Sequence, residues 1–509
     1  MKTRVKNPFT RLGGALCAAW VLPALIASLV LMLAGLATAQ IFTTLHSFAV
    51  VSGINSNNTN SDGALPQAGL IVSGNILCGT ANQGGAAGYG TVFTVNNNGI
   101  GFTNLHSFTG GNDGANPVGG LILSGNRLYG TANEGGSSGN GTLFAVNTDG
   151  TGFTNLHSFT ALNNFTNSDG ANPQAGLILS GSTLYGTATG GGSSGNGTVF
   201  AVATNGFGFT NLHNFTPDPS PGFTNSDGAS PRGDLVLSGN TLYGTTYDGG
   251  SSGNGTVFAI STDGTVFTDL HNFTATSGSF STNSDGAHPA AGLVLSGNTL
   301  YGTADQGGSS GNGTVFAINT DGMSFTNLHG FTATPSGFNG DGANPAAGLI
   351  LSGNTLYGAA FAGGESGIGI GGWGTVFAVN TDGGEFRTLY SFTTPSLNNG
   401  TYTNKDGARP QARLILSGNS LYGTATEGGI SGNGTLFALS WPELTIMPSG
   451  ANVILTWPTN ATGFNLQSAT NLVSTAVWTN VAPGPVIING QKTVTNPISG
   501  PQQFYRLSH

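Results

Sequence analysis

Short apolar runs separated by glycine-rich polar turns fill residues 42–440, and none has the 3.6-residue spacing of an amphipathic helix. Four such runs, rich in β-branched, aromatic and Leu residues, form a block of about 57 residues that occurs seven times. Ser-Gly-Asn-like turns join the first two runs, as between Leu177 and Leu184, and Thr-Asp-Gly-like turns join the last two, as at Asp149-Gly150. Each block therefore predicts four short antiparallel strands.

An Asp-Gly pair before the first strand sets the register of every block. Its Asp always lies 8 positions before the Leu that opens the first strand, whereas the segment preceding the pair varies in length. Constant spacing is typical of structured parts and variable spacing of surface loops, so we expect the preceding segments at the surface. The seven residues are Asp62, Asp113, Asp169, Asp227, Asp285, Asp341 and Asp406.

Tandem four-stranded antiparallel units are typical of β-propeller blades, and seven is a usual number of them. The chain enters the repeats with a fourth strand, at Phe42–Phe48, and leaves them with a third strand, at Gly434–Ser440. Pairing these two ends would complete a split blade and remove exposed sheet edges. The sequence thus predicts an all-β chain whose residues 40–440 form a seven-bladed β-propeller closed by an N-terminal strand. A β-solenoid with capping units is the alternative.

Two aromatic series recur once per block, and we expect them to pack between blades because large apolar side chains stabilise a core when buried. Cys78 stands where other blocks have Tyr, and we expect it to be a small buried hydrophobe. The Tyr series is Tyr129, Tyr185, Tyr243, Tyr301, Tyr357 and Tyr422, and the Phe series is Phe93, Phe144, Phe200, Phe258, Phe316, Phe377 and Phe437.

Two runs carry a family resemblance. Asp169–Ala188 reads Asp-Gly-Ala-Asn-Pro-Gln-Ala-Gly-Leu-Ile-Leu-Ser-Gly-Ser-Thr-Leu-Tyr-Gly-Thr-Ala, and Gly195–Val202 reads Gly-Asn-Gly-Thr-Val-Phe-Ala-Val. The chain resembles the tandem GloVer repeat proteins secreted by bacteria, over about 400 residues. The resemblance implies a distant relation to kelch-type propellers and an extracellular location, but no particular activity. Members of the family often carry a C-terminal sorting segment, whereas this chain ends Phe-Tyr-Arg-Leu-Ser-His. Its blocks also lack the regular Trp of kelch blades.

Residues 1–39 are predicted to be a signal peptide. Four basic residues precede the apolar stretch 15–36, and Ala37-Thr38-Ala39 is a small-x-small cleavage site before Gln40. We expect a secreted or cell-surface protein with no membrane insertion after cleavage. An uncleaved anchor is the alternative, because the stretch is long enough to span a bilayer.

The net charge of the chain limits the kinds of molecule that it can bind. Cleavage would remove four of the 12 Lys and Arg, which leaves eight against 21 Asp and Glu, so nucleic acid is excluded as a partner. Charged residues are 6% of the chain and Gly numbers 87, a composition that usually signals disorder. Here the glycines sit at fixed turn positions between apolar strands, which favours an ordered chain.

Residues 441–509 have a different pattern, with short strand-like runs and no block. They resemble a small fibronectin-III-like or other Ig-like β-sandwich, for which Trp457 and Trp478 are the expected core. Attachment or spacing is its expected role.

The loops of each block fall on two ends of the predicted blade. One end carries only tight turns, whereas the other carries the Gly-Gly loops and the variable Asp-Gly segments, and we expect function on this second end. Carboxylates gather there beside the Gly-Gly loops, which suits a cation or a polyhydroxyl ligand. They are Glu134, Asp248, Asp305, Glu365 and Glu427.

The seven Asp of the Asp-Gly pairs have two interpretations. In the structural one Asp caps a turn and Gly takes a positive φ. In the other these oxygen-rich segments bind calcium, although they lack the alternating acidic residues and distal Glu of an EF-hand loop. No cofactor is predicted beyond this possible calcium.

A His recurs on the predicted outer strand in six of the seven blocks, and a structural role is favoured because residues so far apart cannot share one metal ion. These residues are His46, His106, His157, His213, His271 and His329.

The sixth block breaks the symmetry, because its Tyr357 to Phe377 distance is 20 in place of 15. The longer loop brings Phe361, Glu365 and Trp373 to the predicted functional end. Trp373 could stack on a sugar ring or could pin its own loop to the blade, and both interpretations are open. The tripeptide Arg232-Gly233-Asp234 matches an integrin motif but lies at a regular repeat position, which favours coincidence.

Taken together, these features predict a non-enzymatic protein that binds an extracellular glycan or protein through its loop-bearing end. A structural or adhesion scaffold is one alternative. A polysaccharide hydrolase or lyase is another, but the chain has no nucleophile elbow or metal-binding motif, and its repeated carboxylates come from equivalent positions.

Overall fold

The computed structural model describes residues 40–508 except 53–57, 219–222, 335–338, 365–371, 399, 460, 462–463, 473–476 and 499–501, and every strand or helix element it contains there is a β-strand. The predicted signal peptide lies outside these residues. No helix in the described part of the chain is long and apolar enough to cross a membrane. Two compact units are present, Phe42–Leu439 and a second one that holds Ser440–His509 together with Ile41.

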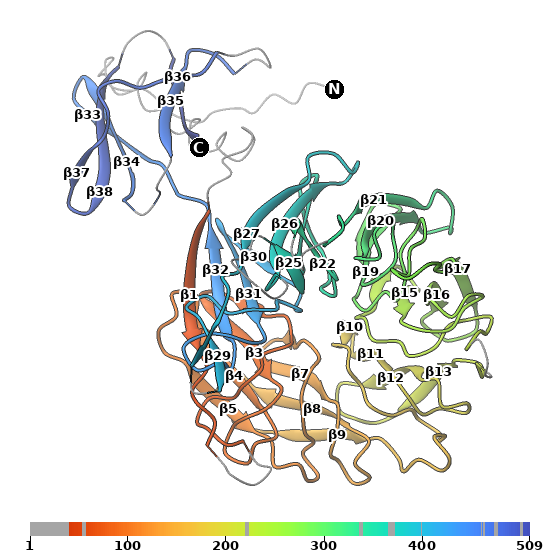
Figure 1. Ribbon diagram of the computed structural model, residues 1–509. Helices are drawn as coiled ribbons and strands as arrows, with labels where there is room; N and C mark the ends of the chain where they lie inside the picture. The colour runs from red at the N-terminus through yellow and green to blue at the C-terminus, as the bar shows by residue number, and fades with distance from the viewer. Residues whose placement is uncertain are drawn as a thin grey trace, which may run out of the picture. The chain divides into compact units, whose positions relative to one another are not determined.

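The larger unit consists of tandem four-stranded antiparallel sheets, which follow one another in chain order (Figure 1). Six sheets are built from strands close in sequence, and a seventh has the order β1-β32-β31-β30, so that the N-terminal strand completes it.

The first three sheets in chain order contain β2 (Ile71–Ser73), β3 (Ile76–Ala81), β4 (Thr91–Asn96) and β5 (Thr103–Ser107); β6 (Ile122–Ser124), β7 (Arg127–Ala132), β8 (Thr142–Asn147) and β9 (Thr154–Ser158); and β10 (Ile178–Ser180), β11 (Thr183–Ala188), β12 (Thr198–Ala203) and β13 (Thr210–Asn214). The next three contain β14 (Val236–Ser238), β15 (Thr241–Thr246), β16 (Thr256–Ser261) and β17 (Phe267–Asn272); β18 (Val294–Ser296), β19 (Thr299–Ala304), β20 (Thr314–Asn319) and β21 (Thr326–Gly330); and β23 (Ile350–Ser352), β24 (Thr355–Ala360), β26 (Thr375–Asn380) and β27 (Arg387–Ser391). The split sheet contains β1 (Ile41–Ser47), β30 (Ile415–Ser417), β31 (Ser420–Ala425) and β32 (Thr435–Ser440). Two small additions are the pair β22 (Asn339–Ala343) with β25 (Ala362–Gly364) and the hairpin β28 (Ser396–Asn398) with β29 (Thr401–Thr403).

The predicted strands and turns are confirmed in register. In the third sheet Ser180 pairs with Thr183 across a two-residue turn, and β11 pairs with β12 from Thr183↔Ala203 to Ala188↔Thr198. Gly186 lies opposite Phe200, and a Cβ at Gly186 would lie 2.7 Å from the Phe200 ring. The repeated Leu-Tyr-Gly-Thr glycine therefore makes room for the repeated Phe.

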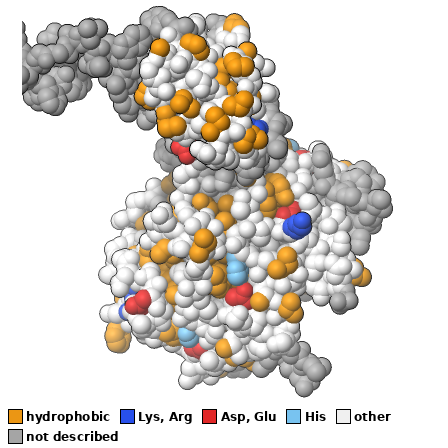
Figure 2. All heavy atoms as spheres, turned by 90° about the vertical axis from the view of Figure 1, so that its left-hand side faces the viewer, with side chains coloured by type: hydrophobic (Ala, Val, Ile, Leu, Met, Phe, Trp, Pro, Cys, Tyr) orange, Lys and Arg blue, Asp and Glu red, His pale blue; other side chains and the backbone are white. Residues whose placement is uncertain are grey.

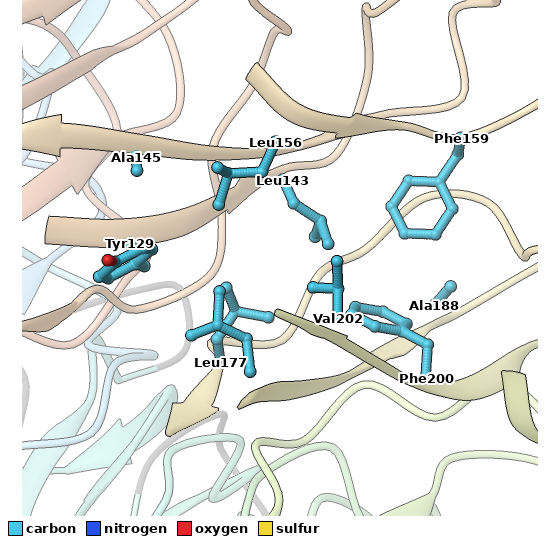
Figure 3. Packing of buried hydrophobic residues seen from close by; sticks show 10 residues of the cluster. Tyr129, Leu143, Ala145, Leu156, Phe159, Leu177, Ala188, Phe200 and Val202 are labelled. Carbon is cyan, nitrogen blue, oxygen red and sulfur yellow. The ribbon is translucent and has the colours of Figure 1, made fainter. Parts of the chain in front are cut away.

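Neighbouring sheets pack face to face through apolar side chains, as predicted for the two aromatic series. Tyr129 and Leu143 of the second sheet pack with Leu177 and Phe200 of the third in one buried cluster (Figure 3). All seven Phe of the series are fully buried, and all Tyr of the series except the half-buried Tyr357 are buried. Cys78 is buried too, as expected, and burial raises the pKa of its thiol to about 11.

Aromatic stacking also links each outer strand to the next sheet. His106 of β5, for example, stacks on Phe153 of the following sheet with ring centroids 3.8 Å apart. The same stack occurs in successive sheets at His46–Phe102, His106–Phe153, His157–Phe209, His213–Phe267, His271–Phe325, His329–Phe386 and, with Tyr in place of His, Tyr390–Phe42.

The smaller unit has two sheets of its own. They are β33 (Thr445–Ser449), β34 (Asn452–Pro458), β38 (Gln491–Pro497) and β37 (Val486–Ile488), and β36 (Thr479–Asn480), β35 (Asn465–Ala469) and β39 (Phe504–Ser508). Trp457 is fully buried in the core of this unit, as predicted. Trp478 is only half-buried and lies 4.4 Å from the Arg506 guanidinium, outside that buried cluster, so its assignment to the core is wrong.

Candidate functional site

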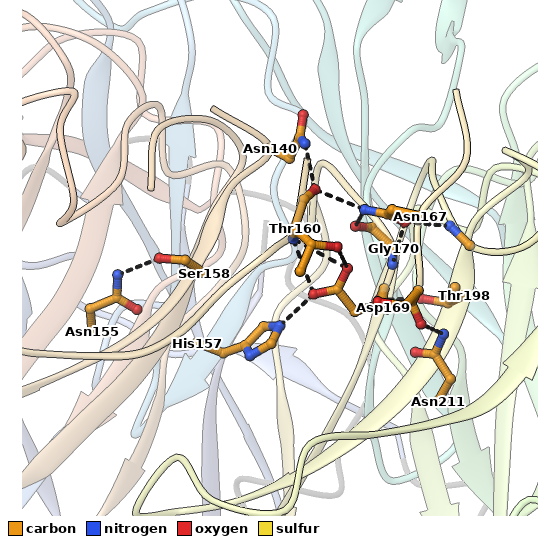
Figure 4. A network of polar contacts seen from close by, with 12 residues as sticks. Asn140, Asn155, His157, Ser158, Thr160, Asn167, Asp169, Gly170, Thr198 and Asn211 are labelled. Carbon is orange, nitrogen blue, oxygen red and sulfur yellow. Dashed lines mark hydrogen bonds and ion pairs between the residues drawn. The ribbon is translucent and has the colours of Figure 1, made fainter. Parts of the chain in front are cut away.

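Each Asp of an Asp-Gly pair is held by the outer strand that precedes it. Nε2 of His157 donates to Oδ2 of Asp169 at 2.9 Å, and the backbone N–H of Thr160 donates to the same oxygen at 3.1 Å (Figure 4). The Thr160 hydroxyl donates to Oδ1. This arrangement recurs with His46–Asp62, His106–Asp113, His213–Asp227, His271–Asp285 and His329–Asp341, and the Tyr390 hydroxyl replaces His at Asp406.

The turn itself is closed by an Asn two residues before the Asp. Oδ1 of Asn167 accepts the N–H groups of Gly170 and Gly192 at 2.9 and 2.8 Å, and Gly170 has φ +104°. The expected positive φ of the glycine is thus confirmed, whereas the capping role expected of Asp169 belongs to Asn167. The Asp169 carboxylate accepts from His157 and Thr160 instead, and these three hydrogen bonds tie the variable loop to the outer strand.

These donors set the electrostatics of the Asp residues. Burial raises the pKa of Asp169, but the hydrogen bonds from His157 and Thr160 and the charge of His157 outweigh it, so the pKa is lowered overall. The pKa of Asp227, Asp285 and Asp341 is lowered in the same way. In the described part of the chain no group of three or more His, Cys, Asp and Glu side chains is arranged to hold a metal ion.

A left-handed residue follows each pair, at X in Asp-Gly-Ala-X-Pro. Its φ lies between 53° and 58° in all seven blocks, a conformation that Asn tolerates and most side chains do not. X is Leu65, Asn116, Asn172, Ser230, His288, Asn344 and Arg409 in chain order. Asn fills this position in three blocks, and His288 and Arg409 are the two members of the row with ionisable side chains.

His288 is the centre of the first cluster on the loop face, which we define as the end of the sheets with the Gly-Gly loops and the inter-sheet connections. Nδ1 of His288 donates to the Tyr247 carbonyl at 2.9 Å and lies 3.4 Å from Oδ1 of Asp248. The Arg232 guanidinium lies 3.7 Å from the centre of the Tyr247 ring. We call Arg232, Tyr247, Asp248, His288 and Asp305 the His288 cluster.

Burial, hydrogen bonds and neighbouring charges all shift pKa values in the His288 cluster. Burial lowers the pKa of His288, but its hydrogen bonds to Asp248 and Tyr247 and the charges of Asp248 and Asp305 raise it above its ordinary value. Burial raises the pKa of Asp305 despite hydrogen bonds and the opposing charges of His288 and Arg232. Perturbed groups gathered on a loop face are typical of functional sites.

Arg409 organises a second cluster, between the sixth and seventh sheets. Its Nη1 donates to Oε1 of Glu427 at 3.0 Å, and its guanidinium carbon lies 5.2 Å from the rings of both Phe361 and Trp373. Arg409 and Glu427 are about two-fifths exposed, so the ion pair is open to a ligand. We call these four residues the Arg409 cluster.

Of the two interpretations of Trp373, the structure fits the one in which it pins its own loop, because the residue is only 7% exposed and forms a β-bridge with Gly363. Its indole N–H has no acceptor among the described residues. The backbone N–H of Arg409 donates to the Trp373 carbonyl at 2.8 Å, which fixes the backbone of Arg409 beside Trp373.

The structure thus groups most of the predicted site residues. Asp248 and Asp305 fall in the His288 cluster, and Phe361, Trp373 and Glu427 fall in the Arg409 cluster. Glu134 is exposed and belongs to neither cluster, and Glu365 lies outside the described residues. Sequence reasoning missed Tyr247, His288 and Arg409, and it interpreted Arg232 only as part of a coincidental tripeptide. The departure from Asn at position X was a signal for His288 and Arg409.

Arg232 and Asp234 of the integrin-like tripeptide have structural partners. Arg232 packs on Tyr247, and Oδ1 of Asp234 accepts the Gly176 N–H at 2.6 Å. These contacts favour coincidence over an integrin motif, because both charged side chains are bound within the repeat.

Likeness to solved structures is distant. An oligogalacturonate lyase in complex with manganese is 11% identical with a TM-score of 0.42, over 80% of this chain and 97% of that one. An oligogalacturonate lyase from Vibrio parahaemolyticus is 9% identical with a TM-score of 0.39, over 80% and 98%. TolB from Acinetobacter baumannii is 14% identical with a TM-score of 0.33, over 59% of both chains.

No curated protein matches this chain. A family model does match, at residues 36–218, 158–282 and 279–474, and together these segments span nearly all of the repeats. Because this family model matches well over half of the chain, the chain belongs to the Gloeobacter/Verrucomicrobia repeat family.

Proposed function

We propose that this protein is a non-enzymatic recognition protein that binds a glycan on the loop face of a closed, seven-bladed β-propeller. Contacts between the first and last sheets support closure. The backbone N–H of Leu65 donates to the Asn433 carbonyl at 2.9 Å, and the Thr424 hydroxyl donates to the Ala68 carbonyl at 3.3 Å. Corresponding bonds join neighbouring sheets elsewhere, such as Asn116 N–H to the Tyr89 carbonyl.

One observation carries the recognition proposal, namely that the residues which break the repeat lie on successive sheets of one face. Positions that hold mainly Asn and Thr in the first three sheets hold Tyr247, Asp305 and Phe361 in the next three, beside His288 and Arg409. An asymmetric ligand is recognised by what differs between equivalent blades, so this part of the face is the proposed site.

The chemistry of the two clusters suits a polyhydroxyl ligand. Aromatic rings offer apolar faces, and the Arg409–Glu427 pair and His288 offer donors and acceptors at fixed positions. Charged side chains are otherwise scattered on the face of the larger unit drawn in Figure 2, where His lies beside a carboxylate.

The proposal also places the protein outside the cell. The basic and apolar residues 1–36 and the small residues before Gln40 support export. The two-sheet C-terminal unit, built around Trp457, is proposed to be an Ig-like or fibronectin-III-like spacer.

The test is binding of the mature chain, Gln40 to His509, to an array of polysaccharides, with and without calcium. His288→Asn and Arg409→Asn remove the functional groups and leave the residue that the repeat itself tolerates at φ near 55°. We expect each variant to weaken binding at least about tenfold, equivalent to about 1.4 kcal/mol. Leu65→Asn makes the same change at the same repeat position of the first sheet and should leave binding intact.

If the wild-type protein binds no polysaccharide on the array, glycan recognition is refuted and a scaffold or adhesion role is favoured. Equal binding by wild type and both Asn variants would remove the two clusters from the site.

A polysaccharide hydrolase or lyase is the second candidate, and the His288 cluster favours it. A His flanked by two carboxylates, one of them with a raised pKa, could exchange protons with a bound sugar. Incubation with the bound polysaccharide decides between the two, because catalysis would release reducing ends and recognition would leave the chain length unchanged.

A further inference from the structure

Three phenylalanines on the loop face are strongly exposed. Phe165, Phe223 and Phe280 are 81%, 62% and 76% exposed, and each lies in the connection between the last strand of one sheet and the first strand of the next. They occur in three successive connections, β9–β10, β13–β14 and β17–β18, shortly before the Asn that closes the Asp-Gly turn. An apolar ring at this exposure gains nothing from burial within the chain.

The backbone at two of these residues is strained. Asn163 and Thr166 exchange backbone hydrogen bonds of 2.8 and 3.1 Å, so that Asn164 and Phe165 form the two-residue tip of a turn, with φ 50° and 68°. Phe223 has φ 48°. Gly or Asn is the ordinary choice at such positions, and a bulky residue there is an outlier. Strain without burial indicates that the ring is retained for something outside the chain.

The turns that carry the rings rest on the Gly-Gly loops. A Cβ at Gly195 would lie 3.2 Å from the Phe165 carbonyl, and the Phe280 carbonyl leaves no room for a Cβ at Gly311. Ser277 and Thr282 exchange two backbone hydrogen bonds of 2.9 Å that fix the turn around Phe280. Phe165 and Phe280 are therefore presented by backbone that is held at close contact, which lowers the entropy lost on binding.

The segments around Phe165 and Phe280 are polar and carry no charge, whereas the connection that holds Phe223 contains Asp218. Residues 161–168 and 274–284 consist of Asn, Ser, Thr, Gly, Ala and Leu apart from the Phe itself. Amides and hydroxyls beside an exposed ring match a sugar, which offers apolar C–H faces for stacking and hydroxyls for hydrogen bonds. The absence of cationic residues in these segments disfavours an anionic chain as the ligand.

We propose that Phe165 and Phe280, with Phe223 between them in the series, are stacking platforms for a neutral polysaccharide. Equivalent rings on successive sheets suit a polymer with a repeating unit, because each further contact is made at high effective concentration. This inference rests on the proposed glycan recognition by the loop face, but it assigns a second site, made of residues outside the His288 and Arg409 clusters.

The test is affinity electrophoresis of the mature chain in gels that contain a neutral β-glucan, xyloglucan or galactomannan, with polygalacturonate gels and phosphatidylcholine vesicles as comparisons. We expect at least one neutral polymer to retard the protein, and the Phe165→Gly/Phe280→Ser variant to lose at least about tenfold in affinity. Phe207→Ser is the matched control, because Phe207 is 76% exposed but lies on the β12–β13 turn at the opposite end of the sheet.

A second readout separates a binding role from a structural one. Asn adopts a positive φ with less strain than Phe and, unlike Gly, adds little freedom to the unfolded chain, so Phe165→Asn should raise the midpoint of thermal unfolding while it weakens binding. A lowered midpoint would show that the ring serves the fold and would overturn the proposal.

Other outcomes also overturn it. These are no retardation by any neutral polymer, retardation unchanged in the double variant, or binding to vesicles that the double variant loses. In one further pattern, the wild type and the double Phe variant bind a glycan that the His288→Asn and Arg409→Asn variants no longer bind. That result would support the proposed function and would refute the role of the Phe rings. The reverse pattern supports the platform and removes the two clusters from recognition.

Discussion

The Asp of each Asp-Gly pair shows how one side chain ties a variable loop to a fixed strand. Asp285 is 5% exposed and accepts from Nε2 of His271, the backbone N–H of Thr274 and the Thr274 hydroxyl. His271 is at the same time stacked on Phe325 of the next sheet. The repeated His therefore joins a loop, a strand and the neighbouring sheet, which explains its recurrence without a metal.

Replacing this carboxylate should destabilise the larger unit. Asp285→Ala leaves three donors without their acceptor, so we expect the free energy of unfolding to fall by about 2 kcal/mol. Urea unfolding followed by fluorescence measures the change. Asp263→Ala is the control, because Asp263 lies in an exposed turn where water replaces its hydrogen bonds, and a loss as large there would contradict the explanation.

At the scale of elements, the approach of neighbouring sheets is set by the residue that precedes the first-strand Leu. This row contains Gly69, Gly120, Gly176, Asp234, Gly292, Gly348 and Arg413. A Cβ at Gly292 would lie 2.7 Å from the Asp234 carbonyl, and one at Gly69 would lie 3.0 Å from the Arg413 carbonyl. The close contact of backbones explains the glycines at Gly69, Gly176 and Gly292.

Two members of this row provide a matched pair of variants. Gly292→Ala puts a methyl group against the backbone of the adjacent sheet, so we expect a loss of about 1–3 kcal/mol of stability. At Gly120 the nearest atom would be 3.8 Å from the new Cβ, and Gly120→Ala should be neutral or slightly stabilising. Thermal unfolding of both variants is the measurement, and equal midpoints would show that the sheets can separate without cost.

At the scale of the whole molecule, the repeated carboxylates act together on stability. The pKa of Asp169, Asp227, Asp285 and Asp341 is lowered in the folded chain, because their hydrogen bonds and His partners outweigh burial. A lowered pKa means that folding favours the charged form. The stability that it contributes is complete above the ordinary value of 3.8 and is lost as pH falls through the folded pKa.

We therefore expect the free energy of unfolding to fall steeply below about pH 4 and to change little through these groups between about pH 5 and 8. Urea unfolding over a pH series measures this dependence. Asp285→Ala should have a shallower acid limb than wild type, and identical acid limbs would refute the role of the pairs.

Much of the fold follows from the sequence alone. The constant spacing from Asp169 to Leu177, the alternation in β11 and β12 and the recurring Phe200 position are local or periodic, so strands, turns and core could be predicted without coordinates. Periodicity also indicated which end of each sheet carries the variable loops. Trp478 was misassigned because a lone Trp in a short module carries no periodic signal.

The sites depended on tertiary structure. His157 and Asp169 are separated by a loop of variable length, and Arg409 meets Phe361 and Trp373 across two sheets, so no fixed spacing announces either contact. The sequence by itself determined a repeated β fold, because local strand and turn preferences and periodic burial are written along the chain. Only the tertiary structure decided which side chains meet, because charges and aromatic rings from different sheets become neighbours only when those sheets pack.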